Sequence, residues 1–133
     1  MLEHELDIPK DYVIKDRPDG SPYGVSEEMI TFPKDMPSAF VCNCDLTAAY
    51  VISRLKKDGY RVPEDISVVG FDNYLYPGIC DVNITTYEVD MALMAKSAID
   101  RICQIIEGTA VEKGIAVVEG QLIIRDSAGP LKQ

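Results

Sequence analysis

Apolar residues recur along the chain with two different spacings, and each spacing predicts a different kind of element. Short and nearly continuous apolar runs predict buried strands, whereas apolar residues spaced three and four apart predict helices with one apolar face. The strands are expected over residues 38–43, 66–71 and 84–88, and the helices over 46–58 and 90–107. Gly59 and Gly108 follow the two helices, and glycine commonly ends a helix.

The rest of the chain gives weaker signals of the same kind. We expect a helix end over residues 1–11, a short strand over 12–15, a loop over 16–23, a short helix over 24–31, and strands over 115–118 and 121–125. Strands that are apolar throughout and alternate with helices are typical of a parallel sheet covered on both faces. The predicted fold class is therefore α/β, with a parallel sheet flanked by helices.

Two of the predicted strands end at an acidic residue. Asp45 follows the first strand and Asp72 follows the second. The carboxyl ends of parallel strands meet at one edge of the sheet, where α/β proteins bind their ligands. Asp45 immediately precedes a helix and is expected to cap it. Asp72 is expected to accept hydrogen bonds from a polar ligand, although an aspartate before Asn73 also suits a turn.

Length and charge narrow the functional classes. The chain has 133 residues, enough for one domain with a real core, and 47% of them are hydrophobic. Its net charge of −9 repels phosphate backbones, so this chain alone is not expected to bind DNA. The densest basic group, Arg54, Lys56, Lys57 and Arg61, is interpreted as the solvated end of a helix.

The four cysteines, Cys42, Cys44, Cys80 and Cys103, do not predict a metal site or catalysis. They form no C-x-x-C pair, and His4 is the only histidine, so neither a zinc site nor a Cys–His pair is expected. No cofactor is expected either. The chain shows no secretory h-region and no long apolar run, which predicts a cytoplasmic protein with free thiols and no membrane contact.

The string "VPEDISVVGFDN" at 62–73 is the most specific motif in the chain. Together with "PSAFVCNCD", "ITTYEVD" and "GQLIIRDS" it resembles the LacI/GalR family of bacterial transcription regulators, over about residues 37–128. The resemblance implies a periplasmic-binding-protein-like type I core of two subdomains with a small ligand in the cleft between them, and a separate helix-turn-helix domain. Residues 1–36 would then be an incomplete start of the C-terminal subdomain. Residues 37–133 would be its remainder, with 90–107 as a crossover helix.

The resemblance also assigns candidate ligand contacts. Asp72 lies where family members hydrogen-bond a sugar or a nucleobase, and Asp45 matches the Asp of the family's Asn-Asp pair. Cys44 stands where the family usually has the Asn, and Val89 where some members have a polar residue. Tyr23 is the only aromatic residue in the loop that places an aromatic ring over the ligand. The expected effector is a small polar metabolite, with a sugar as the first candidate, and operator DNA would be bound only through the helix-turn-helix domain.

The resemblance further implies a homodimer. Its expected interface residues, on the helix after Asp45 and in the loop after Asp72, are Thr47, Ala48, Val51, Ile52, Tyr74 and Cys80. The helix 90–107 packs on the other subdomain in this family. In this chain, its apolar stripe of Met91, Met94, Ala98, Ile102 and Ile105 is therefore expected to be exposed and to drive self-association.

Two other functions fit the same fold class. A solute-binding protein of a sugar transport system would share the fold, and an export signal in the gene would favour it, whereas an upstream helix-turn-helix would exclude it. An enzyme is the third class, because a strand-end aspartate such as Asp72 also occurs in phosphoacceptor receivers. Those proteins need an acidic pair and a lysine after a later strand, and residues 84–90 contain no lysine.

Overall fold

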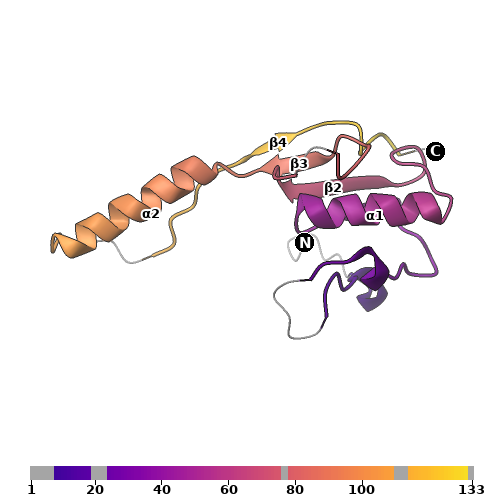
Figure 1. The fold of residues 1–133 in the computed structure, drawn as a ribbon, viewed down its shortest axis with the longest axis horizontal. Coiled ribbons are helices and arrows are strands. Elements are labelled where there is room, and N and C mark those ends of the chain that lie inside the picture. Colours follow the sequence, from indigo (N-terminus) through magenta and orange to yellow (C-terminus); the bar gives the residue numbers. More distant parts are fainter. Residues whose placement is uncertain (1–7, 19–23, 76–77, 110–113, 132–133) are drawn as a thin grey trace.

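The structure is a computed structural model that describes residues 8–18, 24–75, 78–109 and 114–131. Its elements are the 3-10 helices η2 (Lys10–Tyr12) and η3 (Glu27–Met29), strand β1 (Ala39–Val41), helix α1 (Asp45–Lys57), strands β2 (Ser67–Asp72) and β3 (Thr85–Glu88), helix α2 (Met91–Ile106) and strand β4 (Gln121–Ile123). The strands form one sheet in the order β1-β2-β3-β4. Figure 1 shows this sheet beside α1, with α2 extending away from both.

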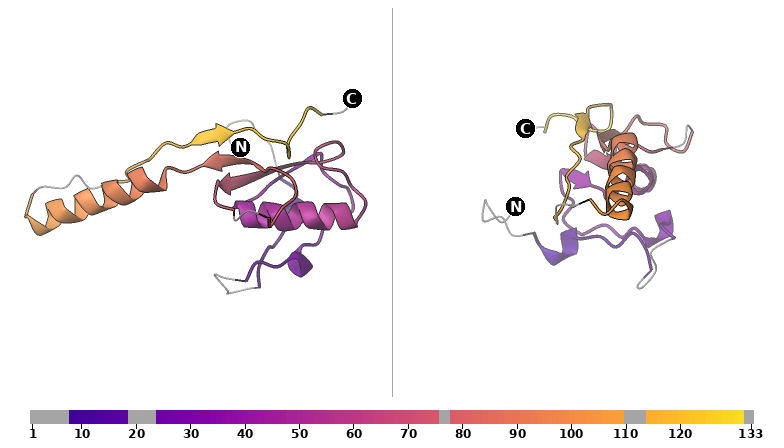
Figure 2. Two further views of the ribbon diagram at one scale, coloured as in Figure 1. Left: turned by 45° about the horizontal axis from the view of Figure 1, so that its top comes forward. Right: turned by 90° about the vertical axis from the view of Figure 1, so that its left-hand side faces the viewer.

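The first three strands are parallel, as predicted, whereas β4 runs antiparallel to β3. The sheet is therefore mixed, and the expectation that every strand is parallel is wrong for β4. The antiparallel direction arises because the chain leaves the sheet after β3, forms α2, and returns along β3 (Figure 2). One consequence is that β4 begins at the edge where β1, β2 and β3 end.

The hydrophobic core lies between α1 and one face of the sheet. Ala48, Ile52 and Leu55 of α1 are fully buried, and they pack in one cluster with Phe40 of β1 and Val68 of β2. The apolar face predicted for this helix therefore packs against the sheet. Asp58 follows the helix as its C-cap, and Gly59 then takes a left-handed conformation with φ of +91°.

The other face of the sheet is open in the part of the chain that the structure describes. Val41, Phe71 and Leu122 lie on it with 86%, 44% and 58% of their surface exposed. Tyr87 also lies there, and its ring stacks on that of Phe71 with centroids 5.6 Å apart. The expectation of helices on both faces is thus wrong for the described residues, because α1 covers only one of them.

Helix α2 forms as predicted but contributes nothing to the core. Asp90 caps it, because its Oδ1 accepts a hydrogen bond from Leu93 N at 2.8 Å, and Gly108 follows it with φ of +72°. No residue of α2 is buried, and Met94, Ile102 and Ile105 are between 47% and 61% exposed. The predicted exposure of the apolar stripe is confirmed. Self-association stays a prediction.

Three weaker expectations are not met. Tyr12 lies in η2 and residues 13–15 lie outside any strand, because the chain turns there with Tyr12 N donating to Pro9 O at 2.9 Å. Residues 115–118 also form no strand, and Ile115 is 95% exposed. The short helix predicted over 24–31 is the single 3-10 turn η3. Residues 1–7 of the predicted first helix end lie outside the described residues.

The C-terminal segment is anchored to the sheet by Ser127, which is completely buried. Its Oγ donates to Val68 O at 2.6 Å and accepts from Thr85 N at 2.8 Å, so that it bridges β2 and β3. Next to it, Asn83 Nδ2 donates to Asp126 Oδ2 at 2.6 Å. This segment therefore joins β3 and β2 through residues that lie 42 and 59 positions before Ser127 in the chain.

We expect Ser127→Ala to lower the free energy of unfolding by about 2–4 kcal/mol, because it removes the side-chain partner of a buried carbonyl and of a buried N–H. Ser67→Ala is the matched control, since Ser67 Oγ bonds Gly129 in an exposed place, and we expect it to cost about 0.5 kcal/mol. Urea unfolding of the three proteins measures both values. Equal costs for the two variants would contradict the anchoring role of Ser127.

Candidate functional site

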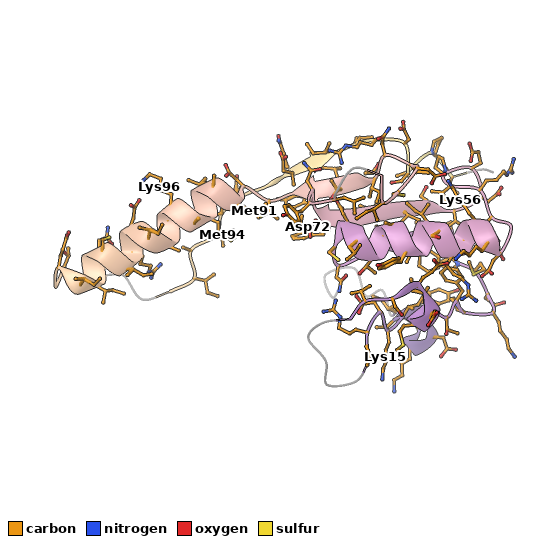
Figure 3. The ribbon with its side chains drawn as sticks, viewed as in Figure 1. Lys15, Lys56, Asp72, Met91, Met94 and Lys96 are labelled. Carbon is orange, nitrogen blue, oxygen red and sulfur yellow. The ribbon has the colours of Figure 1, made fainter. Side chains whose placement is uncertain are left out.

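The carboxyl ends of β1, β2 and β3 meet at one edge of the sheet, as the parallel order requires. Asp72 is the last residue of β2 and pairs in register with Glu88, the last residue of β3. Cys44 follows β1 and precedes α1. Figure 3 shows Asp72 at the end of the sheet from which α2 departs, beside the first turn of α1. We call this place the strand-end edge.

Asp72 lies in an uncommon backbone conformation. Its φ is +94° and that of Asn73 is +52°, and two successive residues other than glycine rarely adopt such values. The turn is held by Asp72 Oδ1, which accepts from Tyr74 N at 2.9 Å. Asp72 is half-buried, so its carboxylate can both form the turn and accept a hydrogen bond from a ligand hydroxyl or amine.

A chain of side-chain hydrogen bonds supports the edge behind Asp72. Arg125 Nη2 donates to Asn73 Oδ1 at 2.7 Å, and Asn73 Nδ2 donates to Glu88 Oε1 at 2.7 Å. Gln121 Nε2 donates to Glu88 Oε2 at 2.5 Å. The bonds from Gln121 and Asn73 lower the pKa of Glu88 and keep it charged. The network fixes the turn that carries Asp72.

Asp45 does not cap α1. Cys44 is the N-cap, with φ of −158° and with Sγ accepting from Thr47 N at 3.4 Å, whereas Asp45 is the first helical residue. The predicted cap is wrong by one position, because the chain leaves the extended conformation after Cys44. Asp45 instead turns toward the sheet and lies against Gly70, with 1% of its surface exposed. Burial, followed by the charge of Asp72, raises its pKa.

Asp16 is a residue of this edge that the sequence reasoning missed. Its carboxylate accepts from Arg17 Nη2 at 2.8 Å, from Asn43 Nδ2 at 3.0 Å and from Thr47 Oγ1 at 3.1 Å. Arg17 is the first cause that holds the pKa of Asp16 well below its usual range. These bonds attach the loop around Asp16 to the turn between β1 and α1. The "DRPDG" stretch indicated only a loop, and no local signal pointed to these distant partners.

The other predicted ligand contacts are less well defined. Cys44 is partly buried and lies at the edge, where its Sγ is 3.3 Å from Thr47 Oγ1. Val89 lies between β3 and α2 and lines a shallow depression with Asp90, Glu119 and Gln121. Tyr23 lies outside the described residues. Contacts of Asp72, Cys44 and Val89 with a ligand stay predictions. A ligand could contact the Asp45 side chain only if the residues that bury it moved apart.

The six residues assigned to a dimer interface divide into two groups. Thr47, Ala48, Val51 and Ile52 are at most 6% exposed, because they face the chain's own sheet and loops. Tyr74 is 56% exposed and Cys80 is partly exposed. The interface stays a prediction, and the burial of the first four residues argues against their part in it.

Within the described residues, no three His, Cys, Asp or Glu side chains gather in a way that could hold a metal ion. In the same part of the chain, no helix combines the length and apolar character that crossing a membrane requires. The described edge therefore offers hydrogen-bonding and charged side chains, chiefly carboxylates, to a ligand.

Comparison with known proteins places this edge in a family. Residues 1–128 match the family model described as "Periplasmic binding protein-like domain". The chain is similar to the arabinose metabolism transcriptional repressor of Geobacillus stearothermophilus, with 31% identity over 130 residues that make up 94% of this chain and 36% of the relative. The chain thus spans about a third of the length of that curated relative.

Solved structures agree with this match. A lac repressor dimer bound to operator and the anti-inducer ONPF has a TM-score of 0.63 and 30% identity over 69% of this chain and 32% of that one. A LacI family transcriptional regulator from Lactobacillus casei with bound sucrose has a TM-score of 0.58 and 25% identity over 77% of this chain and 35% of that one. Both are regulators of transcription, and both structures contain a small molecule.

Proposed function

Because the chain belongs to the periplasmic-binding-protein-like domains of LacI-type transcription regulators, we propose that it is the effector-sensing part of such a regulator. The expected effector is a small polar metabolite that binds at the strand-end edge. Control of transcription would follow from coupling this binding event to a helix-turn-helix domain, which the described fold does not contain. We propose a cytoplasmic protein without catalytic activity.

The observation that carries the proposal is the constrained turn at Asp72. The left-handed backbone at Asp72 and Asn73, the bond to Tyr74 N and the network through Arg125 hold one partly exposed carboxylate at the strand ends. A turn held by that many contacts limits the freedom of its acceptor before a ligand arrives. Such preorganisation lowers the entropic cost of binding.

A sugar is the effector class that we favour. The described edge contains the carboxylates of Asp72, Glu88 and Asp90, which repel anionic metabolites such as phosphates. The arabinose repressor and the sucrose-bound regulator are similar to this chain, and their names point to sugars for those proteins. Cys44 accepts hydrogen bonds more weakly than the usual asparagine, so we expect a set of sugar contacts that differs at this position.

The test is a binding panel on the 133-residue chain, read by saturation-transfer NMR with pentoses, hexoses, disaccharides, nucleosides and sugar phosphates. We expect at least one neutral sugar or nucleoside to bind, and the sugar phosphates to bind more weakly than their neutral parents. Binding of sugar phosphates alone would contradict the proposed ligand class. No binding by any compound in the panel would contradict effector sensing by this chain.

We expect the chain itself to bind no duplex DNA, because its net charge is −9. In this proposal, operator contact belongs to the helix-turn-helix domain and not to the effector-sensing part. Fluorescence polarisation of a labelled duplex at low salt measures the interaction. Saturable binding at micromolar concentration of the chain would contradict this expectation, and the effect of added salt would show whether phosphate contacts are responsible.

A homodimer is the proposed assembly of the sensor. Its support is the apolar stripe of α2, which the part of the chain that the structure describes leaves about half exposed. Tyr74 is 56% exposed and Cys80 is partly exposed, and both follow the turn at Asp72.

A further inference from the structure

Asp45 has a buried carboxyl group whose surroundings the proposed function leaves unexplained. Only 1% of Asp45 is exposed, and within the described residues its Oδ1 accepts no hydrogen bond. The Thr86 hydroxyl and the Phe71 backbone lower the pKa of the carboxyl, whereas burial, the largest cause, raises it. An unbonded oxygen in a fully buried place is costly when the group carries a full charge.

Gly70 is the reason that the carboxyl fits. A Cβ on Gly70 would overlap Asp45 Oδ1, and it would also lie 3.2 Å from Ile84 Cγ2. The carboxyl therefore fills the space that the missing side chain leaves between α1 and β2. Gly70 lies two residues before Asp72 on the same strand and faces the same side of the sheet. The contact between Asp45 and Gly70 therefore lies two residues from Asp72 along β2.

Burial is the main cause that opposes the ionisation of Asp45, and the charges around it act in both directions. Asp72 at the end of β2 raises its pKa, in addition to the larger effect of burial. Arg125, after β4, lowers it, and the first turn of α1 also favours a negative charge. Arg125 is already hydrogen-bonded to Asn73 Oδ1 and Ile84 O. Asp16 and the buried Cys42 thiol, which also face this end of α1, provide no positive charge.

We propose that Asp45 keeps its proton in the folded chain and is a positioning residue for Asp72, with its neutral carboxyl wedged against Gly70. In this arrangement Asp72 and Asp45 do not repel each other, and Asp72 carries the negative charge at this end of β2. The Thr86 hydroxyl, which accepts from Asn73 N at 3.3 Å, lowers the pKa of Asp45, but its effect is smaller than the opposite effect of burial. The inference rests on the proposed function only where it calls Asp72 an effector contact.

The first test is the pH dependence of unfolding. An acid that is protonated in the folded chain and ionised in the unfolded chain makes stability fall as pH rises from the unfolded pKa to the folded pKa. Asp45→Asn keeps the shape of the neutral acid and removes its titration. We therefore expect the urea midpoint of the unchanged protein to fall relative to that of Asp45→Asn as pH rises from about 4 toward 8. A constant difference between the two midpoints over that range would overturn the proposal.

The second test is the position of the strand end, read from backbone amide signals without any ligand. We expect the amides of Gly70, Phe71, Asp72 and Asn73 to keep their chemical shifts in Asp45→Asn and to move in Asp45→Ala. Equal movement in both variants would show that the space-filling neutral carboxyl does not position Asp72. If Asp45→Asn fails to fold, the carboxyl 13C signal of Asp45 in the unchanged protein decides: an ionised signal near pH 5 overturns the proposal, and a protonated signal supports it.

Neither test requires an effector, so failure of the sugar panel and failure of this inference are separate results. If the chain binds no panel compound but shows the expected pH dependence, the proposed effector class is wrong and the proposal of a protonated Asp45 stands. If the chain binds a sugar at Asp72 but shows no pH dependence, the proposed function stands and the proposal of a protonated Asp45 is wrong.

Discussion

Replacing Asp72 with alanine is expected to weaken effector binding by at least about tenfold, because a hydrogen bond to a charged group contributes roughly 1.5–3 kcal/mol. The same change also removes the acceptor for Tyr74 N, which holds the turn. Asp72→Asn separates the two roles, since an amide oxygen can keep the bond to Tyr74 N but lacks the charge. We expect both variants to bind weakly, and only Asp72→Ala to alter the turn.

The matched control for this experiment is Asp81→Asn. Asp81 is 76% exposed and pairs with Lys56 at 2.7 Å, and it precedes β3, so it lies far from the strand-end edge. Titration calorimetry with the best ligand of the panel would compare the three variants with the unchanged chain. Affinity in Asp72→Asn that equals that of Asp81→Asn would contradict the binding role of Asp72 and leave it a turn former.

The second large effect is expected at α2, where Ile102→Glu should convert an associating chain into a monomer. The helix has no buried residue, yet Met91, Met94, Ile102 and Ile105 form one apolar stripe, each about half exposed. Figure 3 shows Lys96 on the side of α2 opposite to Met94, which leaves the stripe clear of that charge. Covering such a stripe recovers about 25 cal/mol for each Å² of apolar surface removed from water.

We expect a second copy of the chain to cover the stripe, since the same face on two molecules is self-complementary in a twofold arrangement. The resemblance to the family implies that another subdomain covers this helix in longer members, so the experiment uses the 133-residue chain. Gln104→Glu is the control, because it adds the same residue to α2 outside the stripe. Light scattering at micromolar concentration should give a dimer for the control and a monomer for Ile102→Glu. A monomeric unchanged chain would contradict the expectation.

The sequence predicted the elements whose pattern is local. Apolar spacing placed both long helices within a residue or two of α1 and α2, and the buried run before Asp72 placed β2. The strand-end position of Asp72 followed from the parallel order of β1, β2 and β3 alone. These features depend on periodicity and on the geometry of parallel sheets, and both can be read from a short stretch of chain.

The features that were missed depend on partners far away in the chain. Asp16 bonds Thr47 across 31 positions, and Ser127 bonds Val68 across 59. The N-cap of α1 is Cys44 and not the predicted Asp45, whose side chain is buried against Gly70. No local sequence pattern indicates that contact. Strands predicted over 12–15 and 115–118 had apolar residues but no neighbouring strand to pair with in the described fold.

Binding of the effector at the strand-end edge is tested most directly by residue-resolved NMR during a titration with the best panel ligand. We expect the largest changes in backbone amide shifts at Cys44, Asp72, Asn73 and Val89. Residues at the opposite end of the strands, such as Asp65 and Asp81, should stay unchanged. Changes concentrated at Asp65 and Asp81, with the amides of Asp72 and Asn73 unmoved, would contradict it.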